Sequence, residues 1–262
     1  MTTLSTKLVV ENLTKTFRDL RVLEGINAAI QREEFISIVG PSGCGKTTFL
    51  RIIGGLEAAT HGSVHIDGEL SIGPSKDKAF VFQQDNLLPW RTVLENTEIG
   101  LEISGRDVAR QRRQATLGLI DLVGLKGFEK FYPRQLSGGM RQRVNIARAL
   151  AIDPEVLLMD EPFSALDAQT REIMQTELTR IWSQGRKTVL FVTHQIDEAV
   201  FLSDRVFVFG RRPGRIREMI GIDLPRPRSL AIKRAPEFVA YVDQIWKMIE
   251  EDVRKSVIDE HI

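Results

Sequence analysis

The sequence predicts an α/β fold that combines a mostly parallel sheet with an antiparallel β layer and a helical subdomain. Short apolar runs alternate with helical stretches along much of the chain. Strands that alternate with helices form mostly parallel sheets. One apolar run, residues 35–39, ends at a glycine loop that leads into a helical stretch. A longer stretch, from about residue 87 to 150, has helical character throughout.

The N-terminal part contains the segments that we expect to form the antiparallel layer. Residues 8–13 and 22–30 alternate between apolar and polar side chains, which is typical of half-buried strands. Residues 63–69 carry the pair Asp67-Gly68, a strong signal for a tight hairpin turn. These three segments therefore predict antiparallel strands.

The remaining segments predict the mostly parallel sheet and its helices. The insert between the predicted strands 78–82 and 156–159 is too long for a simple crossover, so we expect a helical subdomain there, at about 87–150. The other predicted strands are 35–39, 188–193 and 205–209, and the predicted helices are 46–54, 108–123, 140–151 and 168–184.

A second segment of the chain is expected beyond residue 224. The run Leu224-Pro225-Arg226-Pro227 has two prolines and is typical of a linker. Pro236 suits the first turn of a terminal helix. We therefore predict one large domain over residues 1–224 and a linker with a helix over 225–262. Apolar side chains share one face of that helix: Phe238, Tyr241, Val242, Ile245, Ile249 and Val253.

Composition and charge exclude several classes of function. The 36 basic and 35 acidic residues leave a net charge of +1, so no bulk attraction to nucleic acid or to an anionic membrane is indicated. The one cysteine, Cys44, excludes an internal disulfide. We expect no secretory signal at Met1–Ser5, and no window offers the roughly 18 uncharged apolar residues that a membrane-spanning helix needs. A role in transport would require a membrane segment from another polypeptide.

Residues 40–47, Gly-Pro-Ser-Gly-Cys-Gly-Lys-Thr, fit the phosphate-loop pattern G-x-x-x-x-G-K-[ST]. The glycines let backbone N–H groups point at phosphate oxygens, and the helix that follows adds its positive end. Lys46 supplies a charge for the β and γ phosphates, and the Thr47 hydroxyl can hold Mg²⁺. The pattern predicts a site for ATP with Mg²⁺.

Two carboxylates, Asp160 and Glu161, follow the apolar run 156–159 directly. At the tip of a strand in a phosphate-loop fold, the first acid can hold the water shell of the metal. The second acid can act as a general base toward a water that attacks the γ-phosphate. The alternative is a pair of solvated acids at a strand end. The phosphate loop in the same chain favours the catalytic interpretation over this alternative.

Three weaker features lie at expected strand or helix ends. Gln83 follows one predicted strand and can reach metal and water, and His194 follows another and can contact the γ-phosphate. The segment Ser137-Gly138-Gly139 opens a predicted helix, which makes it either an anion site or a plain helix cap.

In this order along the chain, these motifs resemble the ATP-binding cassette (ABC) family over about residues 7–224. The resemblance implies a P-loop NTPase core of the ABC ATPase type. It identifies residues 164–167 as the D-loop and places Phe17 where an aromatic ring stacks on adenine. It identifies Ser137-Gly138-Gly139 as the signature, and Met140 departs from the Gln that the family usually has there. The resemblance implies catalytic roles for Gln83, Glu161 and His194, and metal contacts from Thr47, Gln83 and Asp160. It implies nucleotide contacts from Phe17, Gly40, Pro41, Ser42, Gly43, Cys44, Gly45, Lys46, Thr47, Thr48, Ser137, Gly138, Gly139 and Asp167.

Three segments are similar to importers of the nitrate, sulfonate and taurine type: 84–91, 194–199 and 212–216. Gln195 departs from that group, which often has Asp there. Within the first segment, Leu87 to Trp90 would form a groove for a permease helix, or would pack in the core. The arginines between 211 and 217 could face lipid phosphates or form a plain basic turn, and the charged run 106–113 is expected to be a solvated helix face.

The resemblance implies a head-to-tail homodimer that sandwiches ATP between the phosphate loop of one subunit and the signature of the other. We expect a peripheral subunit on the cytoplasmic face of the membrane, bound to an integral permease and acting indirectly with a solute-binding protein, without nucleic acid. The alternatives are a non-transport ABC ATPase that acts on nucleic acid or ribosomes, and the motor of an exporter. For Cys44, the helix start should lower the thiol pKa, and ATP should protect it from maleimide.

Overall fold

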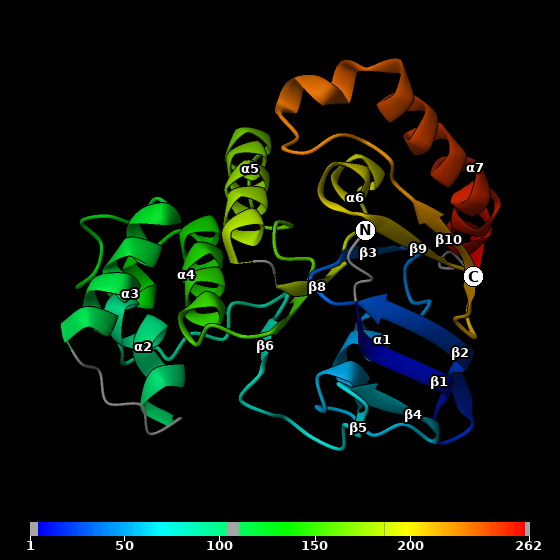
Figure 1. Cartoon of the computed structure of the whole chain (residues 1–262), viewed down its shortest axis with the longest axis horizontal. Helices are drawn as coiled ribbons and strands as arrows, with labels where there is room; N and C mark the ends of the chain where they lie inside the picture. Colours follow the sequence, from blue (N-terminus) through cyan, green and yellow to red (C-terminus); the bar gives the residue numbers. More distant parts are fainter. Residues whose placement is uncertain (1–4, 104–109, 186, 260–262) are drawn as a thin grey trace. The chain divides into compact units, whose positions relative to one another are not determined.

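A computed structural model describes residues 5–103, 110–185 and 187–259, and these residues form two compact units (Figure 1). Unit 1 falls within residues 1–75 and 185–262, and unit 2 within residues 76–184. Both sheet types predicted from the sequence are present, with helices between strands, and the predicted fold class is confirmed. None of the helices in the described ranges is long and apolar enough to cross a bilayer.

The antiparallel layer lies in unit 1 and has the strand order β2-β1-β4-β5. Leu8 and Val10 of β1 are buried, as the alternation predicts, and Leu13 is buried as well because the register shifts between Val10 and Leu13. The turn at Asp67 and Gly68 has positive φ at both residues, which matches the type I′ hairpin favoured by an Asp-Gly pair. The strands are β1 (Thr6–Phe17), β2 (Leu20–Gln31), β4 (His61–Ile66) and β5 (Glu69–Leu70).

The parallel strands of unit 1 form its core. All five residues of β3 and all five of β8 are buried, which explains why both segments are mostly apolar without alternation, apart from Ser37 and Thr188. Strand β10 pairs antiparallel with β9 and lies at the edge. These elements are β3 (Phe35–Val39), β8 (Thr188–Val192), β9 (Arg205–Phe209) and β10 (Ile216–Gly221), with helices α1 (Lys46–Ile53), α6 (Ile196–Leu202) and α7 (Pro236–Asp259) and the 3₁₀ helix η2 (Leu230–Arg234).

Unit 2 contains one parallel strand pair and the predicted helical subdomain. Helix α4 begins at Gly138, two residues before the predicted start, because Ser137 accepts a hydrogen bond from the Met140 backbone N–H and caps the first turn. Of the predicted helix 108–123, residues 108 and 109 lie outside the described residues. The elements are β6 (Lys78–Val81), β7 (Val156–Asp160), α2 (Val93–Ile103), α3 (Arg110–Leu122), the 3₁₀ helix η1 (Pro133–Gln135), α4 (Gly138–Ala151) and α5 (Ala168–Gly185).

Helix α6 and strand β10 of unit 1, like the short η2, had no counterpart in the sequence analysis. Helix α6 has seven residues and buries six of them, so it lacks the polar face that marks a helix in a sequence. Strand β10 carries charged residues along an edge, which hides the alternation of a strand. The segment expected to be a linker is ordered, and Leu224 and Arg228 within it are buried. Helix α7 begins at the predicted Pro236.

Candidate functional site

The phosphate loop lies in unit 1 between β3 and α1, as the sequence predicts. The Lys46 side chain folds back over this loop. Its Nζ donates to the carbonyl oxygens of Gly40 at 2.8 Å and Pro41 at 2.9 Å, and the residue is only 7% exposed. These contacts hold the ammonium group at the N-terminus of α1, where the helix already favours an anion. The arrangement suits phosphate binding.

Two glycines of the loop cannot be replaced without a collision. Gly45 caps the N-terminus of α1 with φ 104°, and a Cβ there would lie 2.6 Å from Cδ2 of Leu23. A Cβ on Gly40 would lie 2.6 Å from the carbonyl oxygen of Phe209. The loop backbone is therefore packed tightly against β2 and β9, which fixes its path.

Cys44 differs from the expectation of a reactive thiol. The residue is 1% exposed, and burial raises the pKa of the thiol in spite of the nearby Lys46 ammonium. The expected lowering of the pKa by the helix start is therefore wrong, because desolvation of the thiolate outweighs it. The side chain packs inside the fold, so only the backbone of Cys44 suits a contact with phosphate.

Labelling of Cys44 by a thiol reagent should be slow in the folded protein. Only the thiolate attacks, and a raised pKa leaves less thiolate at neutral pH, so the rate should climb as pH rises. Time courses with an aromatic disulfide reagent between pH 7 and 9 should show labelling at least about tenfold slower than in denaturant, with ATP slowing it further. Equal rates in folded and unfolded protein would contradict the burial.

His194 and Phe17 are the other predicted site residues of unit 1. Strands β3 and β8 are parallel, and Ile38 lies opposite Val192. Gly40 and His194 each follow this pair by two residues, so both lie at the carboxyl ends of their strands, at the same edge of the sheet. The His194 side chain is exposed. Phe17 ends β1 with its ring largely exposed, and the Lys15 ammonium lies 4.5 Å from the ring centroid.

Gln83 and Glu161 are brought together in unit 2. The parallel strands β6 and β7 pair Val81 with Met159, so both residues lie two positions beyond a paired position. The Gln83 Nε2 donates to Oε2 of Glu161 at 3.2 Å. Glu161 has φ 46°, an uncommon conformation for a residue with a side chain and one that occurs at functional sites. The two residues predicted to act in hydrolysis are thus joined by a hydrogen bond.

Helix α4 holds the segment after β6 through a row of polar side chains that the sequence analysis missed. Gln142 and Asn145, both buried, donate to the carbonyl oxygen of Phe82, directly before Gln83. Arg141 pairs with Asp85 at 2.8 Å, and Arg148 donates to the Asp85 carbonyl at 2.9 Å. The helical spacing of these four residues was the signal that could have revealed this face of α4.

The signature and the D-loop pack against each other in unit 2. A Cβ on Gly139 would lie 3.1 Å from Cδ2 of Leu166, so a larger residue there would require the Leu166 side chain to shift. Asp167 accepts hydrogen bonds from the backbone N–H of Thr170 at 2.9 Å and from its hydroxyl at 2.7 Å, which lower the pKa of the Asp167 carboxyl. Its side chain therefore caps α5, and Ser137 caps α4.

Trp90 does not belong to the core. Its side chain is 70% exposed, which excludes the core alternative for this residue. Hydrogen bonds to the buried Asn96 hold the backbone on both sides of Trp90. The Asn96 side chain accepts from the Leu88 backbone N–H at 2.8 Å and donates to the Leu88 and Arg91 carbonyls. An ordered backbone thus presents an exposed indole ring.

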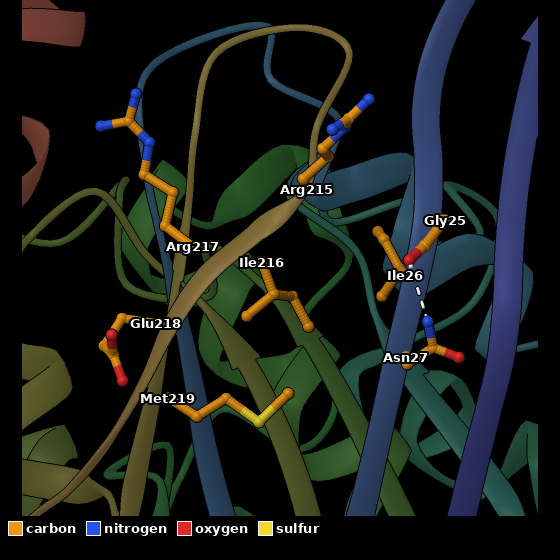
Figure 2. A pocket seen from close by; sticks show the side chains of 8 residues that line it. All are labelled: Gly25, Ile26, Asn27, Arg215, Ile216, Arg217, Glu218 and Met219. Atoms are coloured by element: carbon orange, nitrogen blue, oxygen red, sulfur yellow. Dashed lines mark hydrogen bonds between the residues drawn. The ribbon is translucent and has the colours of Figure 1, made fainter.

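Two of the four arginines near β10 form ion pairs within unit 1. Arg215 lies 2.6 Å from Glu24, and Arg217 lies 2.8 Å from Asp252 of α7. These pairs favour the plain basic turn over a contact with lipid phosphates. The same two arginines line a hollow of about 400 Å³ between β2 and β10, where Figure 2 shows their guanidinium groups extended away from Met219. The residues that line this hollow include no residue predicted to bind nucleotide.

Comparisons with known proteins indicate the family of the chain. A family model described as ABC transporter matches residues 23–164. The chain is 53% identical to an uncharacterized ABC transporter ATP-binding protein of Methanocaldococcus jannaschii, over 96% of this chain and 94% of that protein. It is 46% identical to an aliphatic sulfonates import ATP-binding protein of Bacillus cereus, over 87% of this chain and 89% of that protein. It is also 46% identical to a nitrate import ATP-binding protein of Synechocystis, over 87% of each.

Solved structures give the same assignment. One with a TM-score of 0.76 and 35% identity covers 83% of this chain and all of its own, and is a dimeric post-hydrolysis state of an ATP-binding cassette bound to ADP and Pi. A second, with the same TM-score, 36% identity and the same coverage, is a dimeric bacterial ABC transporter cassette. The chain therefore belongs to the ABC transporter family, as an ATP-binding protein and ATPase.

Proposed function

We propose that this chain is the ATP-hydrolysing subunit of an importer and that it drives a partner permease. The solute is nitrate, a sulfonate, taurine or a similar small molecule. Support for import comes from the relatives, since two of those named above are import ATP-binding proteins. None of these names concerns nucleic acid or ribosomes, so the alternative of a non-transport ATPase has no support from them.

The proposed chemistry assigns separate tasks to the two units. In unit 1, Lys46 and the backbone of residues 40–48 bind the phosphates, and Phe17 stacks on adenine. In unit 2, Glu161 takes the proton of the attacking water. Gln83 orients that carboxylate through its amide N–H, at 3.2 Å. His194 contacts the γ-phosphate and helps to place it for in-line attack.

The residues assigned to Mg²⁺ fit that ion. Thr47, Gln83 and Asp160 all offer oxygen atoms, which a hard cation prefers. Because the Gln83 amide nitrogen donates to Glu161, its carbonyl oxygen is the atom left to face a cation. Asp160 is buried at the end of β7. When bound with ATP, the ion supplies positive charge at the β and γ phosphates.

The proposed working form is a homodimer at the cytoplasmic face of the membrane. The N-terminus of α4, with Ser137 and Gly138 exposed, would bind the phosphates held by the other subunit. Both similar solved cassettes are dimers. ATP binding would close this dimer and hydrolysis would reopen it, and the motion would pass to the permease. A solute-binding protein would deliver the solute on the other side of the membrane.

The observation that carries the permease contact is the exposed ring of Trp90 on a fixed backbone, five residues from the pair Asp85–Arg141 that ties the segment to α4. An exposed indole next to an ordered loop suits the apolar pocket of a partner, since buried aromatic anchors carry much of the energy of an interface. This position would connect the permease to the segment that contains Gln83.

Trp90→Ala should weaken assembly with the permease and leave the isolated subunit intact. Loss of a buried aromatic anchor costs about 2 kcal/mol or more, roughly 30-fold in affinity. A surface substitution should shift the melting temperature by less than about 2 °C. The measurement is co-purification with a tagged candidate permease, together with thermal melting.

Trp246→Ala is the matched control, because Trp246 is another largely exposed tryptophan, at 44%, and lies on α7 in unit 1. It should leave assembly unchanged. Equal recovery of the permease by wild-type and Trp90→Ala protein would contradict the proposed contact, and equal loss in both variants would show that the effect is not specific to Trp90.

A further inference from the structure

The segment after β10 returns to helix α6 and binds its C-terminal end. We call residues 225–233 the C-terminal strap. The guanidinium NH1 of Arg228 donates to the carbonyl oxygens of Val200, Phe201 and Ser203, at 3.0, 3.0 and 2.7 Å. Arg226 donates to the Leu202 carbonyl at 2.7 Å. Two arginines of the strap therefore satisfy four consecutive carbonyls at the end of this helix, which otherwise lack partners within it.

Arg228 is an unusual residue for a connecting segment. It is 4% exposed, and its NH2 donates to the carbonyls of Ile222 and Leu224 at 3.3 and 3.4 Å. Burial lowers its pKa to about 10, so it stays charged at neutral pH. A buried cation is costly unless it is well hydrogen-bonded, and here it lies at the negative end of a helix. The strap is thus fixed to α6 and is not a flexible linker.

The strap also contacts α6 near its other end. Lys233 lies 3.4 Å from Asp197 in the first turn of α6, with its ammonium 5.3 Å from the centroid of the Phe201 ring. Arg226 pairs with Asp204, and Asp204 accepts from the Phe35 backbone N–H at 2.9 Å. The strap therefore connects both ends of α6 and the start of β3, which leads to the phosphate loop.

Helix α6 is in turn tied to the two neighbours of His194. The Thr193 hydroxyl donates to the buried carboxylate of Glu198, in α6. The same oxygen accepts from the Gln195 backbone N–H at 3.0 Å. His194 lies between these two residues, so the path of the backbone that carries its ring depends on Thr193 and Gln195 and on the helix that holds them.

From these contacts we infer that the C-terminal strap is a positioning element for hydrolysis, with Arg228 as its main residue, acting on His194 through α6. This inference rests on the proposed role of His194. The physical reason is distance sensitivity, because a shift of about 1 Å in a group that places the substrate can reduce turnover by up to about 100-fold. The strap would then be part of the ATPase unit, although it follows the two-proline run that separates it in the sequence.

The test compares Arg228→Met with its parent in the full-length protein. Methionine keeps an apolar stem and removes the donors of residue 228 to α6, while those of Arg226 and Lys233 remain. We expect kcat for ATP hydrolysis to fall on the order of 10- to 100-fold, with the KM for ATP within about twofold, because the phosphate loop is unchanged. Arg228→Lys should restore part of the loss, since one ammonium can reach the three carbonyls now bound by NH1. Wild-type kcat in folded Arg228→Met protein would overturn the inference.

A double-mutant cycle separates positioning from general destabilisation. If the strap acts through His194, Arg228→Met should cause no further loss of kcat in a His194→Ala background. Equal losses in both backgrounds would overturn the strap's role and leave the role of His194 intact. Unchanged kcat in His194→Ala alone would remove His194 from the proposed function, and the inference would fall with it.

A control variant and two substitute variants keep the test valid. Arg217→Met is the control, since Arg217 lies in the same unit and binds Asp252 and the Met248 carbonyl of α7 rather than α6. It should leave kcat within about twofold of the parent, as expected for a site without shared partners. If Arg228→Met does not fold, Lys233→Met and Arg226→Met carry the same cycle. A loss of kcat in these variants that occurs only when His194 is present supports the inference. Wild-type kcat in both of these variants overturns it.

Discussion

Glu161→Gln is expected to abolish ATP turnover while ATP still binds. The carboxylate oxygen that accepts from Gln83 at 3.2 Å is the acceptor for the proton of the attacking water in the proposed mechanism. An amide cannot take that proton, and loss of a general base costs typically 10²- to 10⁴-fold in rate. The shape of the side chain is kept, so nucleotide affinity should change little.

Three measurements check this variant. Phosphate release should fall by at least about 100-fold, and titration with a fluorescent ATP analogue should give a near wild-type Kd. Gel filtration with Mg²⁺-ATP should show a persistent dimer, because closure without hydrolysis is not reversed. The matched control is Glu155→Gln, directly before β7, at the opposite end of the strand. Wild-type turnover in Glu161→Gln would remove Glu161 from its role.

Lys46→Ala is expected to lose affinity for ATP itself. The Lys46 ammonium is buried to 7% exposure and is aimed over the loop by the carbonyls of Gly40 and Pro41. Hydrogen bonds to charged groups contribute about 1.5–3 kcal/mol, so the loss corresponds to roughly 10- to 150-fold in Kd. The effect differs in kind from that of Glu161→Gln, which should spare binding.

Isothermal titration calorimetry with ATP and with AMP distinguishes loss of the phosphate contact from a general disruption of the nucleotide site. Lys46→Ala should weaken the binding of ATP strongly and the binding of AMP little, because AMP lacks the β and γ phosphates that this cation contacts. Arg51→Ala is the control, since Arg51 is an exposed cation in the last turn of the same helix. If Lys46→Ala binds ATP as tightly as wild type, the proposed role of the loop is wrong.

Local signals in the sequence were sufficient for most elements of the fold. The alternation of residues 8–13, the Asp67-Gly68 pair and the apolar run 35–39 predicted strands and a turn that the structure contains. These signals depend on a residue and its near neighbours, because the periods of strands and helices are short. Helix α6 was not predicted, because burial on nearly all sides removes the alternation of apolar and polar faces that marks a helix in a sequence.

The chemical types of the candidate site were likewise evident in the sequence, while its contacts were not. The pattern of residues 40–47 specifies glycines, a cation and a hydroxyl, and that set already predicts phosphate binding. The hydrogen bond from Gln83 to Glu161 joins residues 78 positions apart, and its existence depends on the register of β6 against β7. The reactivity of Cys44 was misjudged because the sequence cannot show burial, and desolvation decides the pKa of a thiol.

The sequence by itself determined the family, the fold class and the residue types of an ATPase, because these follow from short motifs and from periodicity. Only the tertiary structure decided which side chains are accessible and which are anchored. Trp90 is exposed although it is apolar, and Arg228 is buried although it is charged. The environment of Arg228 comes from carbonyls of α6 about 25 residues away, and the free energy of a side chain depends on such neighbours as well as on its own type.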